Sequence, residues 1–210
     1  MRESITAILF DWDGTLFDSA QISFLAFERV FRELAVPFSR EAYESFYSPN
    51  WRAMYESLEV PGDVWDKADE LWLRHYDESI PKMVDGAHDT LVSLKERGYQ
   101  LGVVTSGTKR RVAREIEALS LSSVFGVVVC NEDVVNRKPH PEGLETAMAR
   151  LAVGGPVCCY VGDAPEDIRM GRNARTLTIG VKSDYPTSKN LSFEQPDIQI
   201  EHITELLNHF

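Results

Sequence analysis

The stretch Ala7-Ile8-Leu9-Phe10-Asp11-Trp12-Asp13-Gly14-Thr15-Leu16-Phe17-Asp18-Ser19 decides the fold, because an apolar run of strand length leads directly into two carboxylates and a glycine turn. Residues i and i+2 of a strand lie on the same face, so we expect Asp11 and Asp13 to project together. Ligands bind at the carboxyl ends of strands in open α/β sheets. Two adjacent carboxylates need a proton or a cation between them. An ordinary Asp-Gly turn after a strand is the alternative.

Length and charge narrow the class of protein. The 210 residues suffice for one large domain or for one domain with a smaller insert. The net charge of −11 argues against nucleic acid and acidic membranes as partners, because phosphates need a basic face. Cys130, Cys158 and Cys159 have no zinc-type spacing and are expected to be small buried residues. With no signal peptide or membrane span in the pattern, we expect a reduced, cytoplasmic protein.

Residues 17–83 contain no β-rich run. Apolar side chains recur there at helical spacing over residues 20–35, 40–46, 51–58 and 64–79. The pattern predicts an all-helical domain over residues 17–83, inserted directly after the first strand.

The rest of the chain alternates between strands and helices. Strands are expected over residues 5–10, 100–104, 125–130, 157–161 and 176–180, and helices over residues 87–97, 109–119, 142–151, 165–174 and 203–209. Residues 182–196 are expected to be irregular. This alternation predicts an α/β fold with a Rossmann-like parallel sheet, built from residues 1–16 and 84–210.

Polar residues follow four of the expected strands, and a parallel sheet brings such positions to one edge. Beyond the first strand they are Thr105, Ser106, Lys138, Asp163 and Asp167. Hydroxyl, ammonium and carboxylate groups around a carboxylate pair make a phosphoryl-transfer site, and oxygen ligands suit Mg²⁺. Each group alone has a structural alternative: a helix cap, a solvated lysine, or an acidic first turn of a helix.

The order of these groups is specific. Asp11-Trp12-Asp13, Val103-Val104-Thr105-Ser106-Gly107, Arg137-Lys138-Pro139-His140-Pro141 and Val161-Gly162-Asp163-Ala164-Pro165-Glu166-Asp167 follow one another along the chain. The set resembles the four motifs of the haloacid dehalogenase-like (HAD) phosphohydrolases, and the helical insert resembles their small cap domain. Within the family the chain is most similar to the phosphoglycolate phosphatase and β-phosphoglucomutase branch.

The resemblance implies a role for each motif residue. Asp11 would be the nucleophile that forms an aspartyl-phosphate, and Asp13 the general acid and then the general base. Thr105 would donate a hydrogen bond to the phosphoryl group, and Lys138 would offset negative charge. Ser106 and Gly107 would contact the substrate.

The resemblance also implies the metal ligands. Mg²⁺ would be held by Asp11, by the backbone carbonyl of Asp13 and by Asp163. Asp167 would be a supporting residue that orients Lys138 or a water on the metal. The implied enzyme is a phosphatase acting on a small phosphomonoester, with phosphoglycolate as one candidate. The sequence does not indicate an oligomeric state.

Single residues separate the phosphatase reaction from other reactions of the family. Dehalogenases lack the second aspartate of the first motif, which is Asp13 here. Phosphonate hydrolases use a lysine in the first cap helix, and residues 20–35 contain none. A sugar phosphomutase shares all four motifs and is the main enzymatic alternative. A catalytically idle binding or regulatory module would have lost a motif residue, and none is lost.

A break in the helical pattern of the insert marks a candidate specificity loop at Asn50-Trp51-Arg52. The fork of Arg52 suits a carboxylate or a second phosphate on the substrate, with Asn50 beside it. The alternative is that Trp51 packs in the cap core and that Arg52 is a solvated residue.

Overall fold

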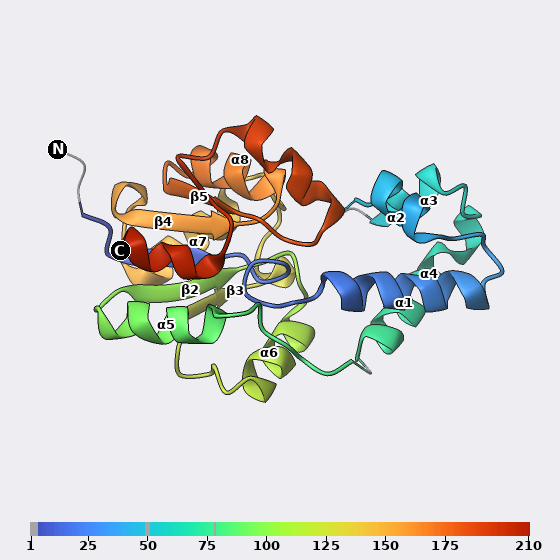
Figure 1. The fold of residues 1–210 in the computed structure, drawn as a ribbon, viewed down its shortest axis with the longest axis horizontal. Coiled ribbons are helices and arrows are strands. Elements are labelled where there is room, and N and C mark those ends of the chain that lie inside the picture. The colour runs from blue at the N-terminus through green and yellow to red at the C-terminus, as the bar shows by residue number, and fades with distance from the viewer. Residues whose placement is uncertain (1–3, 49–50, 78) are drawn as a thin grey trace. The chain divides into compact units, whose positions relative to one another are not determined.

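The computed structural model describes residues 4–48, 51–77 and 79–210, and its contacts divide the chain into two compact units (Figure 1). The α/β unit comprises Met1–Asp18, Pro81–Ser183 and Ser188–Phe210, and the helical unit comprises Ser19–Ile80 with Asp184–Thr187. The sequence did not indicate that Asp184–Thr187 belongs with the helical unit. It does so because the Tyr185 hydroxyl lies 2.9 Å from Ser19 Oγ and its ring lies 5.3 Å from that of Tyr47.

The α/β unit is built on a six-stranded sheet in the order β3-β2-β1-β4-β5-β6, with every pair parallel. The strands are β1 (Ala7–Phe10), β2 (Gln100–Val104), β3 (Val127–Val129), β4 (Cys158–Gly162), β5 (Leu177–Val181) and β6 (Ile198–Ile200). The parallel-sheet prediction is therefore confirmed. β1 is central and buried along its length. The chain runs outward from β1 through β2 to β3 and then returns to β4 on the other side, so the carboxyl end of β1 is the point where ligands bind in such sheets.

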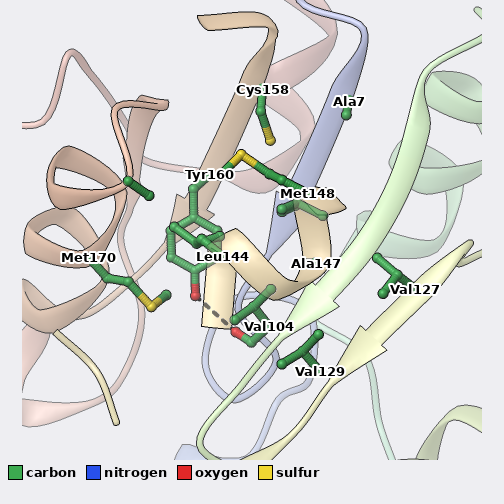
Figure 2. Close-up of a cluster of buried hydrophobic side chains, with 12 residues drawn as sticks. Ala7, Val104, Val127, Val129, Leu144, Ala147, Met148, Cys158, Tyr160 and Met170 are labelled. Atoms are coloured by element: carbon green, nitrogen blue, oxygen red, sulfur yellow. Dashed lines mark hydrogen bonds between the residues drawn. The ribbon is translucent and has the colours of Figure 1, made fainter. Parts of the chain in front are cut away.

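Helices cover the sheet. They are α5 (Ala87–Glu96), α6 (Lys109–Ala118), α7 (Glu142–Leu151) and α8 (Pro165–Asn173). Figure 2 shows the core that α7 and α8 form against one face of the sheet, where Leu144, Met148 and Met170 pack around Tyr160 and Cys158. The three cysteines are buried and free, as expected.

The carboxyl-terminal part differs from the prediction in two places. β6 was not expected, because three residues are too few to show strand periodicity. The expected helix over residues 203–209 is the 3₁₀ segment Ile203–Asn208, and its Glu205 carboxylate accepts hydrogen bonds from the backbone of Glu201 and His202. Further 3₁₀ segments cover Gly62–Val64, Asn131–Asp133, Gly155–Val157 and Pro186–Glu194.

The helical unit has an aromatic core. Its helices are α1 (Ala20–Glu33), α2 (Arg40–Phe46), α3 (Trp51–Ser57) and α4 (Trp65–Asp77), and α1 packs along α4. Phe27, Phe31, Tyr55, Trp72 and Tyr76 are buried between them. This burial of large rings stabilises the unit without help from a sheet. In the described part of the chain, no helix has the length and apolar character needed to cross a bilayer.

Candidate active site

A tight turn follows β1 and fixes the first motif. The backbone N–H of Asp11 donates to the carbonyl of Val161 on β4 (2.8 Å), which holds Asp11 at the sheet edge. Gly14 has a φ of 79°, in the left-handed region that favours glycine. Because β1 ends at Phe10, Asp11 and Asp13 lie beyond the strand rather than on one of its faces. The Asp11 carboxylate pairs with Lys138 and the Asp13 carboxylate with Arg111, so the two do not project together as the sequence predicted.

Lys138 joins two carboxylates of the α/β unit. Its Nζ lies 2.6 Å from Oδ1 of Asp11 and 2.7 Å from Oδ1 of Asp167. Burial opposes the ammonium charge, but the attraction of Asp11 and Asp167 outweighs it and raises the pKa of Lys138 well above its usual range. A lysine held charged between two buried carboxylates is not the solvated loop residue of the structural alternative.

Two hydroxyl groups hold Asp163, the residue after β4. Thr15 Oγ1 donates to Oδ1 of Asp163 (3.2 Å), and Ser183 Oγ donates to Oδ2 (2.6 Å). Both oxygens of the carboxylate are thereby directed. Thr15 lies within the stretch that decided the fold. Ser183 lies in the stretch expected to be irregular, and nothing in the sequence pointed to it.

Three polar groups lie against the Asp167 carboxylate. Besides Lys138, the backbone N–H of Ala164 donates to its Oδ2 (3.0 Å), and the Tyr160 hydroxyl lies 3.2 Å from its Oδ1. The same hydroxyl donates to the Val104 carbonyl (2.9 Å), the dashed contact in Figure 2. Tyr160 was not predicted as a site residue, because a tyrosine in a buried strand has no pattern of its own.

The carboxylates of Asp11, Asp163 and Asp167 each place an oxygen within 4.8 Å of the others, and all three residues are buried. Burial raises the pKa of Asp11 to about 7, although Lys138 opposes the shift. Burial and the charges of Asp11 and Asp167 raise the pKa of Asp163 well above its usual range. Because a cation would relieve this crowding, and the donors are all oxygen, these residues fit Mg²⁺. The Asp13 side chain is not in the group.

Asp13 instead pairs with Arg111 of α6. Arg111 Nη1 lies 2.9 Å from Oδ1 of Asp13, and Nη2 lies 2.5 Å from Oδ2. Arg111 also contacts Glu115 one helical turn further on (3.2 Å). Burial raises the pKa of Glu115 to about 7, against the attraction of Arg111. Neither α6 residue was predicted, because both resemble surface charges in a helix rich in lysine and arginine.

The residues after β2 form a turn. The N–H of Thr105 donates to the Val129 carbonyl (3.0 Å), and Thr105 Oγ1 accepts from the N–H of Gly107 (3.0 Å). Thr105 and Gly107 are buried, whereas Ser106 is exposed. The residue that precedes α6 is Thr108, so Thr105 is not the cap of that helix. The turn lies at the same sheet edge as the residues after β1.

In the helical unit, Arg52 is engaged by its own neighbours. Its Nη2 lies 2.7 Å from Oδ1 of Asp66 and 3.1 Å from Oδ2 of Asp69. The Trp51 ring packs against Phe27 and Trp72, as the structural alternative expected. Asn50 lies outside the described residues. These contacts favour a structural role for Arg52 over the substrate-binding role.

Known proteins are similar to this chain in sequence and in fold. A family model described as haloacid dehalogenase-like hydrolase matches residues 8–181. The chain is 31% identical over 216 residues to pyrophosphatase PpaX of Listeria monocytogenes, covering 99% of this chain and 97% of the relative. A predicted phosphoglycolate phosphatase of Haemophilus somnus superposes with a TM-score of 0.85 at 20% identity, covering 98% of this chain and 97% of that one. A candidate β-phosphoglucomutase of Thermotoga maritima gives 0.78 at 23% identity, covering 98% of each chain.

These matches confirm the resemblance and the expectation of a phosphatase of this kind. The family model covers the first strand, the helical insert and the strands that carry the four motifs. The chain therefore belongs to the haloacid dehalogenase-like hydrolase family.

Proposed function

We propose that this chain is a Mg²⁺-dependent phosphohydrolase of small phosphorylated molecules that works through an aspartyl-phosphate on Asp11. The observation that carries the proposal is the pairing of Asp11 with Lys138 beside two further buried carboxylates. The Lys138 ammonium opposes the rise that burial causes in the pKa of Asp11, and so favours the charged carboxylate. A charged carboxylate at the sheet edge is a nucleophile that an incoming phosphoryl group can reach.

In the first half of the reaction, an oxygen of Asp11 forms a bond to phosphorus while the bond from phosphorus to the leaving oxygen breaks. Asp13 gives its proton to that leaving oxygen. In the second half, Asp13 takes a proton from water, the hydroxide attacks phosphorus, and the bond to Asp11 breaks. Lys138 offsets negative charge on the phosphoryl oxygens, and Thr105 donates a hydrogen bond to the phosphoryl group. Ser106 and Gly107, in the same turn as Thr105, would contact the phosphoryl group or the substrate.

The metal proposal rests on the acidic group described above. Asp11, Asp163 and the backbone carbonyl of Asp13 would hold Mg²⁺, while Asp167 would keep Lys138 in place. When bound, the cation supplies positive charge that draws a phosphate towards a site otherwise crowded with carboxylates. Thr15 and Ser183 would orient Asp163. In the same proposal the helical unit corresponds to the small cap domain of the family.

The similar proteins narrow the choice among candidate substrates. Pyrophosphatase PpaX matches along nearly the whole chain, which favours inorganic pyrophosphate as a substrate. Phosphoglycolate, expected from the sequence, is the second candidate. A sugar phosphomutase is the competing reaction, because its motifs are the same.

A panel of four compounds with Mg²⁺ tests the proposal. The compounds are pyrophosphate, phosphoglycolate, p-nitrophenyl phosphate and β-glucose 1-phosphate, each scored for released phosphate. We expect Mg²⁺-dependent release that EDTA abolishes. No release from any compound would contradict the proposal. Conversion of β-glucose 1-phosphate to glucose 6-phosphate faster than phosphate release would assign the mutase reaction instead.

A further inference from the structure

An ion pair on the α6 side of the first motif is not used by the proposed reaction. Arg111 donates a hydrogen bond to each carboxylate oxygen of Asp13: Nη1 to Oδ1 at 2.9 Å and Nη2 to Oδ2 at 2.5 Å. The arginine side chain is only 10% exposed and that of Asp13 is 25% exposed. A two-point contact between a planar guanidinium and a carboxylate fixes direction as well as charge. The pair therefore determines where the Asp13 carboxylate points.

The buried carboxylate of Glu115 holds Arg111 in place. Glu115 is fully buried and lies 3.2 Å from Arg111 Nη1. The Glu115 carboxylate accepts a hydrogen bond from the Trp12 indole (2.7 Å). Trp12 stands between Asp11 and Asp13 in the sequence and stacks on Phe17. These contacts form a closed network between the turn after β1 and helix α6. It runs from Trp12 to Glu115, from Glu115 to Arg111, and from Arg111 to Asp13, the residue next to Trp12.

We propose that Arg111 is a positioning residue that holds the Asp13 carboxyl group in a resting orientation, and that this pair opens during phosphoryl transfer. The inference rests on the proposed function, in which Asp13 is the general acid. An acid must carry a proton and place its oxygen at the leaving atom. A carboxyl group held at both oxygens by a guanidinium points at Arg111 and away from the leaving atom. The pose in the structure therefore precedes the acid step.

Glu115 competes with Asp13 for the same guanidinium. When Glu115 loses its charge, Arg111 is attracted to Asp13 alone, and the resting pair becomes stronger. When Arg111 and the Glu115 charge are both removed, Asp13 is released and no unpaired buried charge remains. The two changes are expected to act in opposite directions, which a general loss of packing does not produce.

The test compares leaving groups. The quantity kcat/KM reports the steps up to transfer of the phosphoryl group to Asp11. 2,4-Dinitrophenyl phosphate releases a stable anion that needs no acid, whereas phenyl phosphate needs a proton from Asp13. The ratio of kcat/KM for phenyl phosphate to that for 2,4-dinitrophenyl phosphate therefore isolates the acid step. The assay is run with Mg²⁺ at about pH 8, above the pKa of about 7 of Glu115.

We expect Glu115→Gln to lower this ratio and the double variant Arg111→Met with Glu115→Gln to raise it, by about fivefold, the worth of a partly exposed ion pair. Arg110→Met, an exposed arginine on the same helix, is the matched control and leaves the ratio unchanged. If the double variant does not fold, Arg111→Lys replaces the two-point grip by one contact and is expected to raise the ratio less.

A ratio that stays unchanged in the folded variants would overturn the inference. A ratio that falls in the double variant would also overturn it, because Arg111 would then aim Asp13 for catalysis rather than hold it back. Asp11→Asn separates the two proposals. If that variant keeps wild-type kcat/KM, the proposed function fails; if it is inactive while the ratios do not move, only the role of Arg111 fails.

Discussion

The Lys138 ammonium lies 2.6 Å from the Asp11 carboxylate, across 127 positions of sequence. The lysine comes from the loop between β3 and α7, and the aspartate follows the central strand β1. The contact is buried at both ends, so neither charge is balanced by solvent. The stability of the site and its chemistry thus depend on the same pair.

Replacing the nucleophile tests the reaction most directly. Asp11→Asn keeps the shape of the side chain but removes the charge that attacks phosphorus. We expect kcat to fall on the order of 10³-fold or more, with the fold retained. Phosphate release with Mg²⁺ measures the loss, and circular dichroism checks the fold. Undiminished release by a folded variant would rule out Asp11 as the nucleophile.

Removing the ammonium leaves like charges together. In Lys138→Met, Asp11 and Asp167 lose their shared cation, so we expect the free energy of unfolding in EDTA to fall by about 3 kcal/mol. Saturating Mg²⁺ should restore part of it, because the metal supplies positive charge to the same carboxylates. Urea unfolding measures both values. Lys182→Met, which removes an exposed pair with Glu201, is the control and should cost under about 1 kcal/mol. Equal losses in both variants would contradict the prediction.

The fold and the strand-end residues were readable because they depend on local pattern. The apolar run 7–10 identified the central strand, and alternation of strands with helices implied that residues such as Lys138 meet Asp11 at one edge. Side-chain direction was not readable. The rule of alternate faces applies only within a strand, and Asp13 lies beyond the end of β1. Its partner Arg111 is one of several arginines on α6, and only tertiary packing selects it.

Ser183 is predicted to tune metal binding. Its hydroxyl donates to Asp163 at 2.6 Å, and loss of such a supporting contact weakens metal affinity by about tenfold or more. We expect Ser183→Ala to raise the Mg²⁺ concentration for half-maximal activity by that factor, with kcat at saturating Mg²⁺ nearly retained. Ser192→Ala, at an exposed position of the same region, serves as the control. An unchanged Mg²⁺ dependence in Ser183→Ala would remove Ser183 from the metal site.

Glu115 predicts a pH dependence of stability. Burial raises its pKa from 4.5 to about 7, so the folded state binds the proton more tightly than the unfolded state. The stability that this proton provides is complete below about pH 4.5 and is lost as the pH rises through about 7. Relative to Glu115→Gln, the wild type should lose on the order of 2 kcal/mol of unfolding free energy between pH 5 and pH 8. Urea unfolding in EDTA across this range measures it. Parallel curves for the two proteins would show that folding does not raise the pKa of Glu115.

The last prediction concerns Arg52 in the helical unit, where its guanidinium binds Asp66 and Asp69. Asp69 also accepts from the hydroxyl of buried Tyr55 (2.9 Å), so the network ties α3 to α4. An arginine used in this way has a structural task. We therefore expect Arg52→Ala to lower the free energy of unfolding by about 1 kcal/mol.

The same variant should leave kcat/KM for phosphoglycolate and for p-nitrophenyl phosphate unchanged, or change both by the same factor, because neither substrate needs Arg52. Asp69→Ala should reproduce the loss of stability, since it breaks the same network from the other side. Arg32→Ala, an exposed arginine paired with Glu28, is the control. A loss confined to phosphoglycolate would instead show that Arg52 leaves its carboxylates to bind the acidic substrate, because an aryl phosphate offers no second anionic group for its fork.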